Sequence, residues 1–355
     1  MNVSAVTVLI CTYNRASYLK QTLEAILAAP RRSDYQAELI VVDNNSTDET
    51  GRVVEQAAAR ASMPVRYAFE ERQGKSFALN RGLHMAIGDV IAHTDDDVWP
   101  EPEWLDRIVD AFREHDITFA FGKVLPRWGQ QPPPELLTPR AHEIWGPLAI
   151  LDYGDEVLPY RPDDTTLRLP VGANLAFARQ MLIDSGGWRT DLGKVNNSLI
   201  SGEDHEIFHR MRRLNLYAGL YDPAIAVRHY VPARRLTRTY FRRWFYWHGK
   251  TLARMPQEIF YDLDFKRVPH FMGVPRFLYR QFLQQLWQWA RVLGQRDALT
   301  VLIEELRTIQ HLGYFSQCWE WSLRRKARPP DVIQPAVFDE LPAKQGAGGQ
   351  PIVRS

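Results

Sequence analysis

Short apolar runs alternate with helix-spaced apolar residues along the first 125 residues of the chain. The run at 6–12 is β-branched and uninterrupted, which is typical of a strand buried in a parallel sheet. After it, Leu19, Leu23 and Ile26 recur at helical spacing, with Ser17 as the expected N-cap and Pro30 as the stop. The same alternation predicts strands at 38–43, 65–69 and 89–94, and helices after a capping box at 46–49, at 76–87 and at 102–115.

This β-α-β-α order predicts an α/β fold with a mainly parallel, Rossmann-like sheet and helices on both of its faces. In such sheets, ligands collect beyond the carboxyl ends of the strands. Polar clusters follow the expected strands of this chain at that position. We therefore look for functional residues there.

The pattern changes between residues 126 and 170, where proline and aromatic residues replace the regular periodicity. This segment is too long for a simple connection, so we expect an insertion that faces the substrate. Regular order returns with strands expected at 169–177, 217–221 and 225–227, and with a helix at 203–214. The expected organisation is a catalytic domain over 1–230, a basic, tryptophan-rich helical region over 231–330 and a disordered tail over 331–355.

The net charge of +2 excludes a polycation built for nucleic acid, but the charge is uneven. Residues 231–280 hold eleven Lys or Arg against three acids. Cys11 and Cys318 lie far apart in the sequence, which favours a reducing compartment. The start lacks a signal-peptide pattern, and no run reaches the ~18 uncharged apolar residues of a membrane span. We expect a cytoplasmic protein, with peripheral attachment to the inner face of the membrane as an open alternative.

Three consecutive carboxylates, Asp95, Asp96 and Asp97, directly follow a buried strand and have no cation beside them in the sequence. A hard cation such as Mg²⁺ or Mn²⁺ would relieve their repulsion and would leave coordination positions for water and substrate phosphates. The alternative is a solvated acidic turn. Taken alone, the cluster does not decide between the two.

Two further positions are candidates for binding a nucleotide. Asp43 ends the second strand, where a carboxylate can accept hydrogen bonds from a base or a ribose; an ordinary turn into a helix explains it equally simply. Lys75 stands at an expected helix start, where it and free backbone N–H groups could meet phosphate. The spacing around it is not that of a P-loop.

The segment at 201–204 opens a helix, and Asp204 is a candidate general base that would deprotonate an acceptor hydroxyl. The alternative is that Ser201, Glu203 and Asp204 only cap the helix and satisfy its dipole. His229 follows an apolar run and could be a third metal ligand. A lone histidine is more often structural.

These residues, in this order, resemble the large bacterial family of inverting GT-A glycosyltransferases known as family 2. The resemblance runs from about residue 6 to residue 229. It rests on segments that are weak singly and specific together: 7–15 (TVLICTYNR), 41–48 (VVDNNSTD), 74–82 (GKSFALNRG), 88–97 (GDVIAHTDDD), 202–204 (GED) and 222–229 (DPAIAVRH).

The resemblance implies roles for these residues. Asp43 would contact the uracil of a nucleotide-sugar donor. Asp97 would bind the metal with His229, and Asp204, beside Glu203, would be the catalytic base. The other implied donor-binding residues are Thr12, Tyr13, Asn14, Arg15, Lys75, Asn80, Asp95 and Asp96. His205, where a small polar residue is frequent, and the insertion depart from the family pattern, and the insertion leaves the acceptor open.

The implied activity is a metal-dependent, inverting transfer of a sugar from a nucleoside-diphosphate sugar, most commonly a UDP-sugar, to a hydroxyl of a glycan or lipid-linked acceptor. The divalent metal would be Mg²⁺ or Mn²⁺. Two other classes of function stay open on the residues alone. One is a sugar-1-phosphate nucleotidyltransferase, whose usual glycine-rich, basic N-terminal signature is missing here. The other is a non-enzymatic peripheral membrane scaffold.

Six tryptophans follow His229 and are interleaved with arginine: positions 244, 247, 287, 289, 319 and 321. This composition suits an interfacial helix on an anionic membrane surface. It suits equally a set of helices that bury the tryptophans against the catalytic domain and leave the arginines in water.

Overall fold

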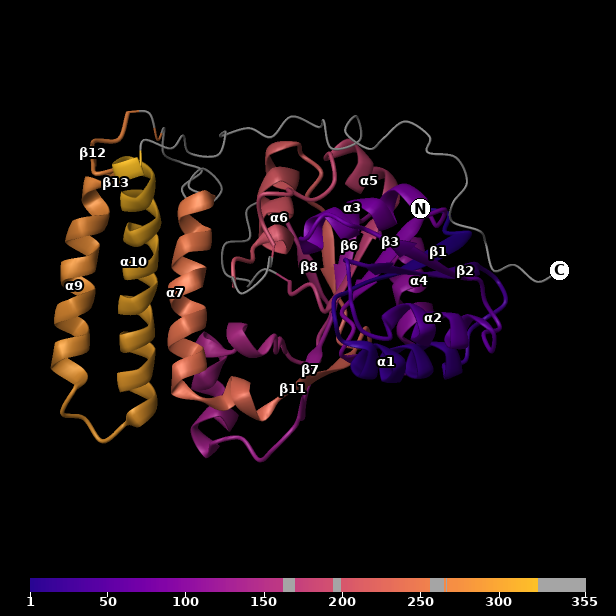
Figure 1. Cartoon of the computed structure of the whole chain (residues 1–355), viewed down its shortest axis with the longest axis horizontal. Coiled ribbons are helices and arrows are strands. Elements are labelled where there is room, and N and C mark those ends of the chain that lie inside the picture. Colours follow the sequence, from indigo (N-terminus) through magenta and orange to yellow (C-terminus); the bar gives the residue numbers. More distant parts are fainter. Residues whose placement is uncertain (162–169, 194–198, 256–264, 266, 325–355) are drawn as a thin grey trace.

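A computed structural model describes residues 1–161, 170–193, 199–255, 265 and 267–324 (Figure 1). The expected tail at 331–355 and the first residue of the strand expected at 169–177 lie outside these residues; the strand itself begins at Asn174, later than predicted. None of the helices in the described parts of the chain is both long and apolar enough to cross a bilayer.

Strands and helices alternate in the first third of the chain, as the pattern predicts. The elements are β1 (Ala5–Thr12), α1 (Ala16–Ala28), β2 (Gln36–Asp43), α2 (Thr50–Ala58), β3 (Val65–Phe69), α3 (Lys75–Met85), β4 (Val90–Thr94), β5 (Val98–Pro100) and α4 (Trp104–Glu114). Residues Val65 to Phe69 form a strand with the predicted bounds. The other boundaries lie within about two residues of the predicted ones, which is the usual uncertainty of helix and strand ends.

Eight strands form the main sheet in the order β3-β2-β1-β4-β9-β6-β10-β8. The strands β3, β2, β1 and β4 are parallel neighbours, while β9 (Asn174–Ala178) runs antiparallel to both β4 and β6 (Phe119–Phe121). The sheet is completed by β10 (Gly219–Tyr221) and β8 (Leu158–Tyr160). Because β1, β2 and β4 are parallel, the loops that follow them emerge at the same edge.

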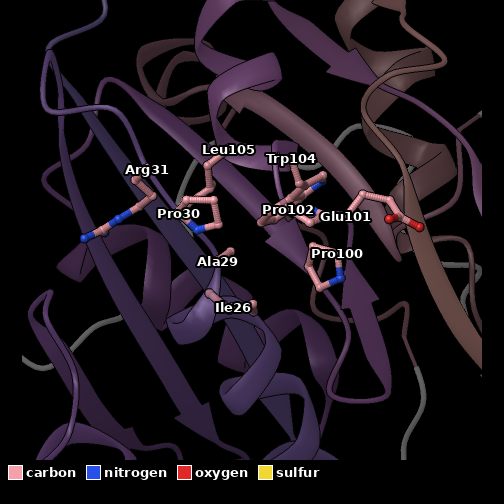
Figure 2. Close-up of a pocket in the computed structure, with 9 residues that line it drawn as sticks. All are labelled: Ile26, Ala29, Pro30, Arg31, Pro100, Glu101, Pro102, Trp104 and Leu105. Carbon is pink, nitrogen blue, oxygen red and sulfur yellow. The ribbon is translucent and has the colours of Figure 1, made fainter.

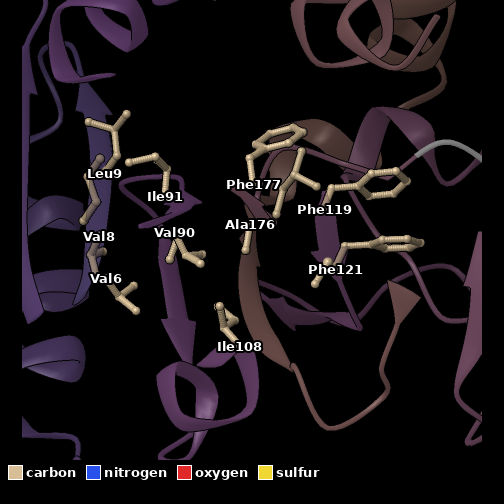
Figure 3. Packing of buried hydrophobic residues seen from close by; sticks show 14 of the residues in the cluster. Val6, Val8, Leu9, Val90, Ile91, Ile108, Phe119, Phe121, Ala176 and Phe177 are labelled. Carbon is tan, nitrogen blue, oxygen red and sulfur yellow. The ribbon is translucent and has the colours of Figure 1, made fainter. Parts of the chain in front are cut away.

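The core lies on both faces of this sheet. Successive strand residues point to opposite faces, and both Val8 and Leu9 are fully buried, so both faces are covered. Figure 3 shows Leu9 and Ile91 beside each other and Phe119 close to Phe177 in this core. Burial of these apolar side chains is the main favourable term in folding the domain.

A second, three-stranded sheet, β5-β11-β7, sets the position of His229, the predicted metal ligand. Here β11 (Val227–Val231) runs antiparallel to β5 and parallel to β7 (Val124–Trp128), and His229 pairs with Val98. The strand expected at 225–227 therefore begins later than predicted. Its partners are distant in the sequence, so the run of apolar residues alone could not fix its start.

Three long helices form the C-terminal region: α7 (Arg238–Arg254), α9 (Arg276–Val292) and α10 (Ala298–Arg324). They stand side by side, with α9 at the outer edge, and the hairpin of β12 (His270–Phe271) and β13 (Val274–Pro275) precedes α9 (Figure 1). The crossing of α7 and α10 needs glycine, because a Cβ atom at Gly313 would lie 1.9 Å from the carbonyl oxygen of Tyr246.

Much of the insertion packs on the C-terminal helices, and whether it also faces the substrate stays a prediction. Its short 3₁₀ turns are Pro134–Leu137, Pro139–Ile144 and Gly146–Leu148. Leu136, Ile144 and Leu148 form one buried cluster with Phe241 of α7 and Ile303 of α10. The remaining described helices are α5 (Arg179–Asp184), α6 (Glu203–Arg213) and the 3₁₀ turn Ala233–Leu236.

Candidate active site

The predicted site residues gather where β1, β2 and β4 end. Thr12 and Asp43 are paired at the ends of β1 and β2, and the three aspartates follow β4. The first turns of α3 and α6 add Lys75 and the acidic pair Glu203 and Asp204. Most of the candidates therefore come from different elements that the sheet brings together.

Two of the three aspartates are buried and share one guanidinium. Asp96 and Asp97 are 3% and 1% exposed, whereas Asp95 is partly exposed. The Arg15 side chain donates from Nη1 to Asp96 Oδ1 at 2.6 Å and from Nη2 to Asp97. Thr12 Oγ1 donates to the other oxygen of Asp96 at 2.7 Å. The acidic cluster is thus a structured site and not a solvated turn.

The electrostatics of the two buried aspartates differ. Burial raises the pKa of Asp96, and the neighbouring charge of Asp97 adds to the rise against the opposing effect of Arg15. Burial would also raise the pKa of Asp97, but His229, in its protonated form at low pH, and Arg15 outweigh it and hold that pKa below its usual value. Asp97 is therefore the carboxylate that stays ionised.

Asp97 and His229 face each other across the β5–β11 pairing. His229 Nε2 lies 3.5 Å from Asp97 Oδ1, and the backbone N–H of Tyr230 donates to the Asp97 carbonyl at 3.0 Å. Burial lowers the pKa of His229 to about 4, so its imidazole is neutral near pH 7. A neutral imidazole is the form that binds a metal ion.

This pair fits a divalent cation that substrate oxygens help to hold. The described residues contain no group of three or more His, Cys, Asp or Glu placed to bind a metal by themselves. Mg²⁺ is commonly held by one or two protein ligands plus water and substrate phosphates, and Asp97 with His229 matches that pattern. Two cations already stand beside the pair: Arg15 on Asp97, and Arg235, whose Nη1 lies 3.4 Å from His229 Nε2.

Lys75 contacts carboxylates in the structure, and the phosphate contact expected from its position at a helix start stays a prediction. Its Nζ donates to Asp95 Oδ1 at 2.9 Å and lies 3.9 Å from Glu203 Oε1. Burial would lower the pKa of Lys75, but Asp95, Asp204 and Glu203 raise it well above its usual value. The ammonium group thus stays charged and links the acidic cluster after β4 to the start of α6.

Asp204 lies in the first turn of α6, but no side chain caps that helix. The N-cap is Gly202, with a φ of 97° and no side-chain hydrogen bond. Asp204 Oδ1 is buried and has no hydrogen-bond partner among the described residues. Capping therefore does not account for this carboxylate, although its charge still suits the helix N-terminus.

Gly172 packs against the Asp204 carboxylate, a contact that sequence reasoning missed. A Cβ atom at position 172 would lie 2.0 Å from Asp204 Oδ2. Gly172 stands just before β9, and nothing in its local sequence signals a contact with residue 204. Arg235 was missed for the same reason, although it lies in the basic run after His229.

The loops after β1 and β2 are tied together. Asn14 has a φ of 51°; its N–H donates to Ser46 Oγ at 2.9 Å, and its Oδ1 accepts from the Thr47 N–H at 2.7 Å. The expected capping box at 46–49 does not form, and α2 begins at Thr50 without a side-chain cap. Ser46 and Thr47, from the expected capping box, instead bond to Asn14 in the loop after β1. The Ser17 cap is likewise wrong, because α1 already begins at Ala16.

Asp43 and Tyr13 lie on these loops. The Asp43 carboxylate accepts from the Ser46 N–H and from the Tyr67 hydroxyl, each at 2.8 Å. These two contacts fix its direction and leave lone pairs free, because each carboxylate oxygen can accept more than one hydrogen bond. Tyr13 is 43% exposed. Tyr67, beside Asp43, is a third residue that the sequence analysis missed.

Asn80 contacts protein backbone and not the open edge of the sheet. It is 4% exposed; its Nδ2 donates to the Trp188 carbonyl, and its Oδ1 accepts from the Trp188 N–H, each at 2.8 Å. In the structure this side chain holds the loop at Trp188, and its donor contact stays a prediction.

A small pocket lies away from these residues, between the end of α1 and the β5–α4 connection (Figure 2). Its lining includes Pro30, Pro100 and Pro102 and none of the predicted site residues. It does not contribute to the candidate site.

A mainly parallel α/β sheet with acidic residues at its carboxyl edge and a carboxylate at a nearby helix start is the arrangement expected from the resemblance to GT-A glycosyltransferases. The model of the family "Glycosyl transferase family 2" matches residues 7–154. Residues 7–154 therefore form a family 2 glycosyltransferase domain. This result excludes the non-enzymatic scaffold.

Similar proteins agree with this class. The chain is 24% identical, over 227 residues, to a glucosyl-dolichyl phosphate glucuronosyltransferase of Haloferax volcanii, covering 63% of this chain and 68% of that protein. It is 35% identical, over 113 residues, to an uncharacterised glycosyltransferase of Nostoc sp., covering 32% of this chain and 34% of that protein. A solved mannosyltransferase from Pyrobaculum calidifontis, in complex with GDP-Man and Mn²⁺, aligns with a TM-score of 0.55 at 19% identity, covering 92% of this chain and 89% of that one. The last comparison shows the GT-A fold.

Proposed function

We propose that the protein transfers a sugar from a nucleoside-diphosphate sugar to an acceptor hydroxyl, with inversion at the anomeric carbon and with a divalent metal. The single observation that carries this proposal is the placement of two acidic groups around Lys75. Lys75 Nζ lies 2.9 Å from Asp95, the first of the three consecutive aspartates, and 3.9 Å from Glu203, the neighbour of Asp204.

The two acidic groups suit the two ends of the reaction. Asp97 and His229 would hold a divalent cation, Mg²⁺ or Mn²⁺, which when bound would offset charge on the departing diphosphate. Asp95, which pairs with Lys75, and Asp96, which pairs with Arg15, would support the donor side of the site. Neutral His229 and ionised Asp97 are suitable protein ligands for such an ion.

Asp204 is the proposed base for the acceptor. It would take the proton of the acceptor hydroxyl while that oxygen forms a bond to the anomeric carbon. The bond from this carbon to the diphosphate oxygen breaks, and its electron pair leaves with the nucleoside diphosphate. One carboxylate suffices for a single displacement, and Asp204 Oδ1 has no hydrogen-bond partner among the described residues.

The nucleoside would lie at the ends of β1 and β2. Asp43, oriented by Tyr67 and Ser46, would accept hydrogen bonds from the base. The turn at Thr12, Tyr13 and Asn14 would form the adjacent wall, and Arg15 would reach the diphosphate side. A uridine nucleotide is the proposed donor; the GDP-Man bound to the Pyrobaculum enzyme makes guanosine nucleotides the second to test.

A lipid-linked or glycan hydroxyl is the proposed acceptor. The Haloferax relative is named for transfer to glucosyl-dolichyl phosphate, a lipid-linked sugar. The chain spans 68% of that relative's length and 34% of the Nostoc protein's length.

A donor screen with matched variants tests the proposal. Purified protein would be incubated with UDP- and GDP-sugars and Mn²⁺ or Mg²⁺, and nucleotide release would be measured with and without acceptor. Asp204→Asn should abolish transfer and leave metal-dependent donor binding nearly intact, whereas Asp97→Ala should weaken that binding. Glu203→Gln, a matched change at the neighbouring carboxylate, should retain more activity than Asp204→Asn.

Calorimetry separates the two halves of the proposal. If donor affinity is the same with and without chelator in the wild type and in Asp97→Ala, no metal acts at this site. If Asp204→Asn loses donor binding and transfer equally, Asp204 is not the base.

A further inference from the structure

The outer face of α9 carries arginine and large apolar side chains in one stripe. Arg276, Arg280, Leu283, Trp287 and Arg291 follow one another at intervals of three or four residues, which places them on the same side of a helix. All five are exposed; Leu283 is 65% and Trp287 61% exposed. The Arg291 guanidinium lies 4.5 Å from the centre of the Trp287 ring.

The opposite face of α9 accounts for its packing on the protein. Leu278 is buried in a cluster with Phe315 of α10, and Gln285 Nε2 donates to Glu304 Oε2 of the same helix at 2.7 Å. Because α9 stands at the outer edge of the three helices (Figure 1), its stripe faces away from them. The stripe therefore contributes nothing to the folded core.

The charge of α9 has one sign. Between Arg276 and Val292 the sequence contains three arginines and no aspartate or glutamate. Leu283 and Trp287 lie one helical turn apart on this face, and each is exposed at 60% or more, so the exposed apolar surface is gathered beside the arginines. A helix with an arginine-rich, aromatic face is suited to the boundary between lipid head groups and acyl chains.

We propose that the outer face of α9 docks on an anionic lipid surface. Trp287 and Leu283 would enter the head-group boundary, and the three arginines would contact lipid phosphates, with their stems along the apolar surface. A second copy of the chain is the less suitable occupant, because a two-fold contact through this stripe would bring arginines against arginines. All charged residues of α9 are positive, so the helix is electrostatically complementary to a negatively charged lipid surface.

The docking helix is joined to the proposed base through α7. The α9 helix packs on α10, and α10 packs along α7. The C-terminal end of α7 meets the start of α6: a Cβ at Gly202 would lie 2.7 Å from Thr251 Cγ2, and the Ser201 N–H donates to Thr251 Oγ1 at 3.2 Å. The proposed lipid-binding helix α9 and the start of α6, which carries Asp204, are thus connected through packed helices.

Flotation with vesicles tests this proposal without any turnover. The full chain would be mixed at low salt with vesicles of phosphatidylcholine alone or with added phosphatidylglycerol. Wild type should float with the anionic vesicles and be released by salt. Leu283→Ser/Trp287→Ser and Arg280→Glu/Arg291→Glu should each reduce the bound fraction at least about tenfold.

Two controls match these changes on the catalytic domain. Ile87→Ser/Leu214→Ser replaces exposed apolar residues, and Arg52→Glu/Arg60→Glu makes the same charge change there. Both should float like the wild type. The proposal is overturned if the wild type does not float, if the α9 variants float as well as the controls, or if sedimentation shows a dimer that the α9 variants lose. Donor binding is measured separately, so failure here leaves the proposed activity untouched.

Discussion

Gly172 lies so close to Asp204 that a Cβ atom added at position 172 would sit 2.0 Å from Asp204 Oδ2. Two different segments thus meet at the proposed base: the approach to β9 and the first turn of α6. The absence of a side chain at 172 leaves the carboxylate room to stand where it does. Asp204 does not cap α6, so a substitution at position 172 can shift its carboxylate without removing a helix cap.

Gly172→Ala should move the Asp204 carboxylate and slow transfer. We expect kcat to fall on the order of 10- to 100-fold, because a displacement near 1 Å at a reacting group has effects of that size. Donor affinity, measured by calorimetry, should change little. Gly294→Ala, at a position with nothing within 4 Å of the added atom, is the matched control. Unchanged kcat in Gly172→Ala would show that this carboxylate position does not matter.

Arg15→Ala should make the protein more dependent on metal. Removal of the guanidinium leaves Asp96 and Asp97 buried without their cation, which should cost about 3 kcal/mol of unfolding free energy. Mn²⁺ bound at Asp97 would compensate part of this loss, so its addition should raise Tm more in the variant than in the wild type. Arg228→Ala, which breaks the exposed pair with Glu101, should show neither effect. An equal Mn²⁺ shift in Arg15→Ala and wild type would contradict competition between arginine and metal.

Asn80→Ala should reduce stability and spare donor binding. The substitution removes both hydrogen bonds to the Trp188 backbone and leaves those buried groups without partners, which should cost about 2–4 kcal/mol. Urea unfolding measures this loss, with Gln180→Ala, at an exposed residue bonded to Asp184, as the control. A large loss of donor affinity in well-folded Asn80→Ala would support the donor contact predicted from the sequence.

Local periodicity was enough to predict the strands and helices in the first third of the chain, because β1, β2 and β4 each contain a run of buried apolar residues. The bounds of β3 were predicted, and the parallel order of β1, β2 and β4 followed from the alternation with helices. The start of β11 was not predictable in this way. Its pairings with β5 and β7 join segments more than 100 residues apart, and these pairings decide where the strand begins.

The candidate site shows the same division. The acids after β4 and the acids opening α6 could be named from their positions at element ends. The contact of Lys75 with both groups of acids could not be predicted from the sequence, because a lysine at a helix start is equally suited to binding phosphate. The polar residues at 46–49 looked like a helix cap, but tertiary contact with the loop after β1 uses Ser46 and Thr47 instead. Where a side chain has several possible partners, only the tertiary structure shows which contact it makes.

Buried histidines should make the protein lose stability in mild acid. His93 in β4 is fully buried without a hydrogen bond to either ring nitrogen among the described residues, and burial, aided by Lys75, lowers its pKa to about 4. In the unfolded chain a histidine titrates near 6.5, so between these two values the unfolded state binds the extra proton. Unfolding free energy therefore falls as pH falls from about 6.5 to about 4, by up to about 1.4 kcal/mol per pH unit for each such histidine. His229, with a pKa of about 4, adds to the same trend.

Urea unfolding of the metal-free protein at a series of pH values measures how steeply the unfolding free energy depends on pH, and His93→Leu should flatten this dependence. A slope that His93→Leu leaves unchanged would mean that this imidazole is already protonated in the folded protein.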